Sequence, residues 1–159
     1  MSQDRKVLFT DGLAPEAREL LEKHSRLFSF EVLTQISKKE LLSRIPEFEV
    51  LSVRTKTSVD RDILAAGKNL KVVARAGTGV DHIDCEAAKD LGIAVMNTAA
   101  ANSISAAELT IGLLLSLLRQ IPRAHQTVSE GGWNPISGVE LHRKTVGIIG
   151  LGRIGRLVA

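Results

Sequence analysis

Short apolar runs alternate with helix-like segments from Lys6 to Met96. Runs rich in Val, Ile, Leu and Phe predict strands at 6–10, 28–33, 50–53, 72–74 and 93–96. The stretches between them predict helices at 15–24, 38–45, 59–66 and 85–91. Because the connections are short, this alternation is typical of an α/β fold with a mostly parallel sheet covered by helices on both faces.

Polar residues and a proline mark where several of these helices begin and end. Ser37 and Glu40 form an S-x-x-E capping box in front of a helix that Pro46 ends. Ser58 and Asp84 are expected to cap the next two helices, since a side-chain oxygen can accept a hydrogen bond from a free N–H group at a helix start.

A long apolar helix is expected at 102–120. The run from Ile111 to Leu118 is almost entirely Leu and Ile, so this helix has little polar face and is expected to pack on more than one side. Pro122 kinks or restarts it, and an irregular connection at 133–144 leads to the last apolar run.

This last run leads directly into three glycines. Thr145 to Ile149 predicts a strand buried on both faces of a parallel sheet. Gly150, Gly152 and Gly155 then match the G-x-G-x-x-G fingerprint, in which the glycines permit a tight turn, close approach of a diphosphate, and close packing of helix on strand. The diphosphate would lie at the start of a helix near Arg153, and a plain glycine turn is the alternative.

These patterns predict two domains. Residues 1–98 form an α/β domain, and residues 99–159 form a linking helix with the first strand and glycine loop of a nucleotide domain. A dinucleotide-binding half also needs further strands and an acidic residue about 20 positions beyond the glycines. Residues 156–159 show no proline and no polar linker, so we expect the chain to be the front part of a longer protein.

Composition restricts the class of protein. The chain is 44% hydrophobic with 3% aromatic residues, and its net charge of +3 is spread along its length. A basic stripe that would indicate nucleic acid is absent, whereas a small anionic substrate is compatible. Cys85 is the single cysteine, and 111–118 is too short an apolar run to span a membrane. With no signal peptide at the start, a cytoplasmic protein without membrane contact is expected.

A second glycine segment, Gly77-Thr78-Gly79, follows the predicted strand at 72–74. Glycines at a strand end leave backbone N–H groups free, and such groups can form a nest for an anion. His82 stands where a third glycine would complete the dinucleotide fingerprint, so this segment is not a second cofactor loop.

Four motifs occur in one order along the chain: VRTKT, RAGTGVDHID, GIAVMNTAAANSISAAELTIGLLLSLLRQIP and GLGRIGR. Together they resemble the D-isomer-specific 2-hydroxyacid dehydrogenases over Val53 to Ala159. The resemblance implies an oxidoreductase with a flavodoxin-like substrate domain, a Rossmann domain for NAD, an active site between them, and homo-oligomers. The expected substrate is a small anionic 2-hydroxy or 2-oxo acid, in the first place 3-phosphoglycerate.

The resemblance also assigns residues. Those at the substrate are Arg54, Arg75, Gly77, Gly79 and Asn102. Those at the cofactor are Thr78, Gly150, Gly152, Arg153, Ile154 and Gly155. The guanidinium groups would hold a carboxylate or phosphate by charge-assisted bonds, although each arginine could also be a solvated strand end. Asn102 could equally be an ordinary helix N-cap.

Two departures from the family pattern leave alternatives open. The family's catalytic Arg, Glu and His have no counterpart here, so we expect the chain alone to be inactive and to bind NAD weakly. Pro135 stands near a position where family members that use 3-phosphoglycerate carry a basic residue. Reduction of glyoxylate or hydroxypyruvate is therefore one alternative, and a non-catalytic dinucleotide-sensing or assembly module is another. The histidines lack metal-ligand spacing, so no metal is expected.

Overall fold

The chain divides into two compact units, 1–99 and 100–159, in a computed structural model that describes residues 5–159. The first unit contains a five-stranded sheet, and the second contains three helices within the part described. The assignment of the first to substrate and of the second to cofactor stays a prediction.

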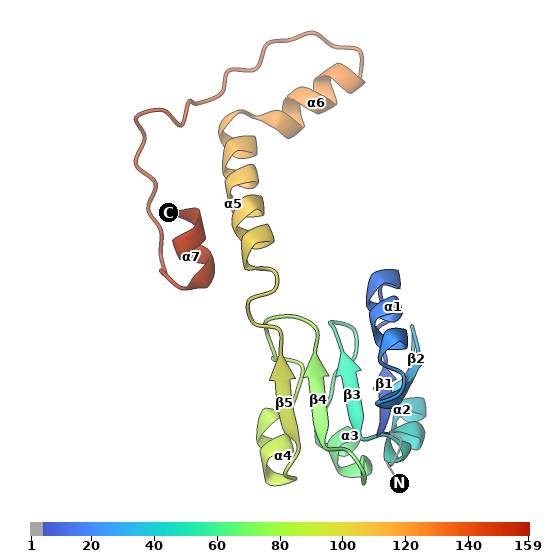
Figure 1. Cartoon of the computed structure of the whole chain (residues 1–159). Helices are drawn as coiled ribbons and strands as arrows, with labels where there is room; N and C mark the ends of the chain where they lie inside the picture. Colours follow the sequence, from blue (N-terminus) through green and yellow to red (C-terminus); the bar gives the residue numbers. More distant parts are fainter. Residues whose placement is uncertain (1–4) are drawn as a thin grey trace. The chain divides into compact units, whose positions relative to one another are not determined.

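All five strands are parallel, in the order β2-β1-β3-β4-β5 (Figure 1). They are β1 (Arg5–Phe9), β2 (Phe28–Val32), β3 (Val50–Val53), β4 (Val72–Arg75) and β5 (Ala94–Asn97). This order is that of flavodoxin-like sheets, so the predicted α/β class and strand positions are confirmed. The register aligns Val53 with Arg75 and Arg75 with Asn97, which brings the carboxyl ends of these strands to one edge.

The helices of this unit are α1 (Pro15–Lys23), α2 (Lys38–Arg44), α3 (Arg61–Ala66) and α4 (Cys85–Asp90), with a 3-10 turn, η1 (Ile45–Glu47), after α2. Ser37 caps α2 by accepting the N–H of Glu40 at 3.2 Å, and Asp84 caps α4 by accepting the N–H of Ala87 at 2.8 Å. Both predicted caps are confirmed, because such caps depend only on residues three positions apart.

The predicted start of the third helix is wrong. Val59 pairs with Ile83 in an isolated bridge, and its N–H donates to the carbonyl of His82. This long-range pairing keeps Val59 extended, so α3 begins at Arg61 and Asp60, instead of Ser58, accepts the N–H of Ile63 at 3.2 Å.

The core lies between one face of the sheet and the helices α2, α3 and α4. Its fully buried members include Leu8, Leu51 and Val73 from the strands and Leu41, Ile63 and Ala87 from the helices. Right-handed crossovers place α1 on the opposite face, and α1 has no buried residue. Met96 of β5 is 61% exposed, so the expectation that helices cover both faces fails at this end of the sheet.

The second unit consists of α5 (Ser103–Leu118), α6 (Ile121–Ser129) and α7 (Arg153–Val158), and α7 packs against α5 (Figure 1). Gln120 has a φ of 55°, and α6 restarts with Pro122 in its first turn at an angle of 63° to α5. No single helix in residues 5–159 is long and apolar enough to cross a membrane, although the bent pair α5 and α6 passes that test together by length and composition.

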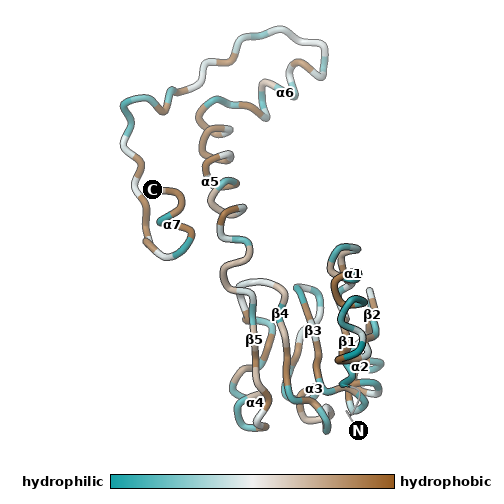
Figure 2. The backbone as a smooth tube through the Cα atoms, viewed as in Figure 1, coloured by the Kyte–Doolittle hydropathy of each residue, from teal (hydrophilic) through white to brown (hydrophobic). Residues whose placement is uncertain are grey.

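The predicted strand from Thr145 to Ile149 is wrong. Val146 is 47% exposed and Ile149 is fully exposed, and the segment is irregular. A buried parallel strand needs hydrogen-bonding neighbours, and residues 145–149 pair with no strand in the part of the chain described. The helix α5 is largely apolar, as its brown colouring in Figure 2 shows, and several of its leucines are exposed. Leu113 is 61% and Leu117 is 69% exposed.

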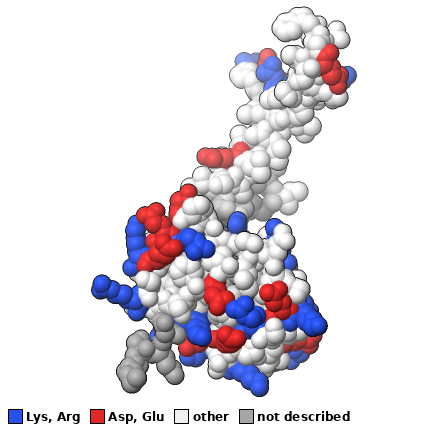
Figure 3. Space-filling view, turned by 90° about the vertical axis from the view of Figure 1, so that its right-hand side faces the viewer, with Lys and Arg blue, Asp and Glu red and all other residues white. Residues whose placement is uncertain are grey.

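Charged groups are distributed differently over the two units. Figure 3 shows blue and red side chains interspersed on the visible face of the first unit, with few charges along the second. The seven ion pairs found in residues 5–159 all lie in the first unit.

Candidate functional site

Two of the predicted substrate residues lie at neighbouring strand ends. Arg75 is the last residue of β4 and is aligned with Val53, the last residue of β3, so Arg54 follows directly beside it. Arg54 is exposed and Arg75 is half-buried. Because ligands of parallel sheets bind beyond the carboxyl ends of the strands, two cations at this edge can receive an anion.

The guanidinium group of Arg75 lies against Gly77. A Cβ atom built on Gly77 would overlap Nη1 and Cζ of Arg75 and would lie 3.0 Å from its Nε. The Nε atom is buried without a hydrogen-bond partner. The N–H of Gly77 donates to the carbonyl of Arg75 at 2.9 Å, so the expectation of a free N–H at Gly77 is wrong in this structure. Contact between Gly77 and the substrate stays a prediction, whereas the structure shows that Gly77 leaves the space that the Arg75 guanidinium group occupies.

The end of β5 holds the glycine segment. Asn97 donates from Nδ2 to the carbonyl of Thr78 at 2.6 Å, and the N–H of Thr98 donates to the carbonyl of Gly77 at 3.1 Å. Asn97 therefore shapes the loop that carries Thr78 and Gly79. The sequence motifs assign Asn97 no role, although an amide at the end of a strand is a usable signal.

Asp11, directly after β1, is a second residue that sequence reasoning missed. Its Oδ2 accepts the N–H of Arg54 at 2.6 Å and that of Lys56 at 3.2 Å, and its Oδ1 accepts the hydroxyl of Thr57 at 2.7 Å. Burial raises the pKa of Asp11, but the hydrogen bonds from Thr57, Arg54 and Lys56 together lower it below its usual 3.8. The carboxylate is therefore charged at neutral pH.

In the second unit the glycine loop stands at a helix start, as predicted. Gly150 has a φ of 95°, and Gly152 is the N-cap of α7. A Cβ atom on Gly155 would overlap the carbonyl oxygen of Gly150, while one on Gly152 would meet no atom within 4 Å. The third glycine thus permits close packing and the second leaves the backbone open, which fits a diphosphate approaching the free N–H groups.

The remaining predicted residues are divided between the units. Arg153 and Ile154 are the first residues of α7, and Ile154 is 40% exposed. Asn102 is the N-cap residue of α5, whereas Thr78 is an exposed residue of the first unit. Their roles at substrate and cofactor stay predictions.

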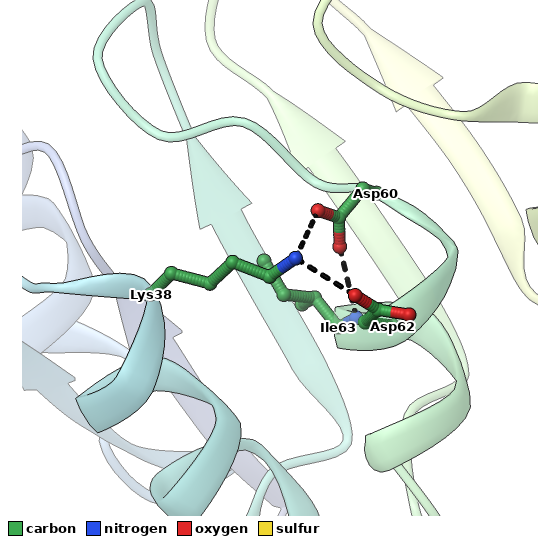
Figure 4. Close-up of polar contacts among 4 residues, drawn as sticks. All are labelled: Lys38, Asp60, Asp62 and Ile63. Atoms are coloured by element: carbon green, nitrogen blue, oxygen red, sulfur yellow. Dashed lines mark hydrogen bonds and ion pairs between the residues drawn. The ribbon is translucent and has the colours of Figure 1, made fainter.

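Lys38 bridges two carboxylates at the starts of α2 and α3 (Figure 4). Lys38 Nζ lies 2.6 Å from Asp60 Oδ2 and 2.8 Å from Asp62 Oδ2. The hydrogen bond from Lys38 lowers the pKa of Asp60, and the same bond raises the pKa of Lys38. This group ties two core helices together and is a structural feature. No cluster of His, Cys, Asp or Glu suited to a metal ion occurs within residues 5–159.

A parallel sheet with two arginines at its carboxyl edge, and a glycine loop at a helix start, are features typical of α/β enzymes that bind dinucleotides. The sequence pattern of "D-isomer specific 2-hydroxyacid dehydrogenase, catalytic domain" matches residues 7–150. The chain belongs to this family of oxidoreductases.

Relatives and solved structures agree with this membership. The chain is 48% identical over 159 residues to a D-3-phosphoglycerate dehydrogenase of Sus scrofa, covering 98% of this chain and 29% of that protein. It is 46% identical over 157 residues to a hydroxypyruvate reductase of Thermotoga maritima, covering 97% of this chain and 50% of that protein. A D-lactate dehydrogenase from Aquifex aeolicus, solved with NAD and lactic acid, superimposes with a TM-score of 0.83 at 29% identity, covering 96% of this chain and 46% of that one.

Proposed function

We propose that these residues are the substrate-holding part and the diphosphate loop of a longer NAD-dependent dehydrogenase that oxidises 3-phosphoglycerate. The observation that carries the proposal is the position of Arg54 and Arg75 at adjacent strand ends of one sheet edge. The chain spans 29% of the pig phosphoglycerate dehydrogenase that it resembles, so the rest of the activity is assigned to residues outside these 159.

Each residue has a role that follows from its chemistry. Arg54 and Arg75 bind the phosphate or carboxylate of the substrate by charge-assisted hydrogen bonds. Gly79 and Asn102 contact the substrate, and Asn97 keeps the glycine segment in shape through Thr78. In the second unit, Gly150 to Gly155 hold the cofactor's diphosphate at the start of α7.

The cofactor supplies the hydride acceptor when bound. Removal of a hydride from a hydroxy acid also requires a base for the hydroxyl proton and a cation that stabilises the forming carbonyl. The arginines at the sheet edge orient the acid, and the base lies outside this chain. The 159-residue chain is therefore expected to bind substrate without turning it over.

The test of the proposal is NAD reduction by the full-length protein with 3-phosphoglycerate, glycerate and D-lactate compared. The phosphorylated acid should be the best substrate by kcat/KM. Turnover of D-lactate or glycerate, with none of 3-phosphoglycerate, would reject the substrate assignment while leaving the family unchanged.

A second candidate is the reduction of hydroxypyruvate or glyoxylate. Pro135 supports it, because this position lacks the basic residue expected near a phosphate, and the Thermotoga relative is named a hydroxypyruvate reductase. The variant Arg54→Ala distinguishes the two candidate functions. If the substrate is a phosphorylated acid, the variant should raise its KM strongly; if the substrate is glyoxylate, the KM should rise only slightly.

A further inference from the structure

Between the carboxyl ends of β1 and β3, the order in which the chain adds strands to the sheet reverses. The chain passes from β1 to β2 on one side, and β3 lies on the other side of β1. Flavodoxin-like sheets bind their ligands at this switch point. In this protein the carboxylate of Asp11 lies at this point and, with Lys56 and Thr57, lines a pocket of about 350 Å³.

Asp11 accepts the hydrogen bonds that such a crevice normally offers to a ligand. The N–H groups of Arg54, Lys56 and Thr57 all point to Oδ2, at 2.6, 3.2 and 3.5 Å. N–H groups that converge in this way can take a carboxylate or a phosphate, as in the backbone nests that bind anions. The carboxylate is therefore a built-in anion that holds the segment after β3.

The hydroxyl groups of two threonines, Thr57 and Thr10, also form hydrogen bonds next to this carboxylate. The Thr57 hydroxyl lies 2.7 Å from Asp11 Oδ1 and 2.9 Å from the hydroxyl of Thr10, which is 1% exposed. Because a carboxylate can only accept, Thr57 donates to Asp11, and its oxygen is left to accept from Thr10. The arrangement orders the Asp11 side chain and keeps it charged.

We infer that Asp11 is a positioning residue: its carboxylate holds the backbone of Arg54 so that the Arg54 guanidinium group serves the substrate site beside the end of β4. The nearest donor to Asp11 is the N–H of Arg54 itself, so the carboxylate sets the backbone from which that guanidinium projects. The inference rests on the proposed role of Arg54 in substrate binding.

Titration of the 159-residue chain with 3-phosphoglycerate, followed by NMR, tests this inference. Asp11→Asn keeps the size of the side chain but turns an NH2 group or a weaker acceptor toward the donors, so the dissociation constant should rise about tenfold. Asp60→Asn is the matched control, because it also removes a charged, hydrogen-bonded carboxylate from this unit. It should change the dissociation constant by less than about twofold.

A double-mutant cycle separates positioning from general loss of structure. In the Arg54→Ala background, Asp11→Asn should weaken binding no further. Thr57→Val removes the hydroxyl that donates to Asp11 and accepts from Thr10, and it should produce a smaller effect in the same direction. This variant replaces Asp11→Asn if the latter does not fold. Unchanged affinity in Asp11→Asn, or an equal loss with and without Arg54, would overturn the inference while leaving the proposed function standing.

Absence of binding to the wild-type chain would instead contradict the proposed function. The Arg54 Nε–H resonance then decides the inference by itself. It should move in Asp11→Asn and stay in place in Asp60→Asn, and an unmoved resonance in both variants would refute a positioning role.

Discussion

The guanidinium group of Arg75 occupies the volume in which a side chain on Gly77 would lie. Gly77 also has a φ of 157°, and its N–H turns back to the Arg75 carbonyl. The glycine is thus required by an arginine two positions earlier, which explains the pair without reference to a ligand.

Gly77→Ala should displace Arg75 and destabilise the first unit by about 1–3 kcal/mol, the usual cost of inserting a methyl group into filled space. Anion affinity should fall as well. Urea unfolding and titration with 3-phosphoglycerate measure the two effects.

Gly112→Ala in α5 is the control, because an added Cβ there meets no atom within 4 Å. It should stabilise its helix by about 0.5–1 kcal/mol. Equal behaviour of both variants would contradict the steric role of Gly77.

The glycine loop offers a second matched pair of variants. Gly155→Ala should disrupt the turn into α7, since its Cβ would overlap the Gly150 carbonyl oxygen, whereas Gly152→Ala should leave the unliganded loop intact. Amide chemical shifts of residues 150–158 report the difference. In the full-length protein both variants should weaken NAD binding, Gly152→Ala because its methyl group stands where the diphosphate approaches.

For the wild-type 159-residue chain we expect NAD binding weaker than micromolar, because only the diphosphate loop of the cofactor site is present. Isothermal titration calorimetry measures this affinity directly. Micromolar binding would mean that residues 5–159 hold more of the cofactor than the glycine loop.

Acid should weaken the fold through two carboxylates. The folded-state pKa values of Asp11 and Asp60 both lie below 3.8, so their stabilisation is present above that pH and is lost as the pH falls through the folded-state values. The unfolded chain binds more protons in this window, and the free energy of unfolding therefore rises with pH. Urea unfolding between about pH 5 and pH 2 should show a smaller slope in Asp60→Asn, and an unchanged slope would refute the assignment.

Exposed leucines on α5 should cause the isolated chain to associate. Leu109, Leu113 and Leu117 are spaced by four residues and are 62%, 61% and 69% exposed. Replacing Leu113 and Leu117 with Gln should shift the sedimentation coefficient toward that of the monomer. A wild-type chain that is monomeric at about 100 μM would contradict the prediction that the exposed leucines of α5 cause association.

The sequence by itself determined the features that depend on near neighbours. The apolar runs predicted all five strands, and the caps at Ser37 and Asp84 were recognisable because donor and acceptor are three residues apart. The glycine spacing predicted a turn into a helix, and α7 begins there. The order of the strands was implied only by the family resemblance.

Tertiary structure decided what depends on distant partners. Asp11 meets the N–H of Arg54 across 43 positions, and Val59 leaves its predicted helix to pair with Ile83. The run at 145–149 has the composition of a strand, yet it has no neighbour to pair with and stays irregular. The strand propensity of a segment depends on its own residues. Its hydrogen-bond partners and its burial depend on distant segments that come close only in the folded chain.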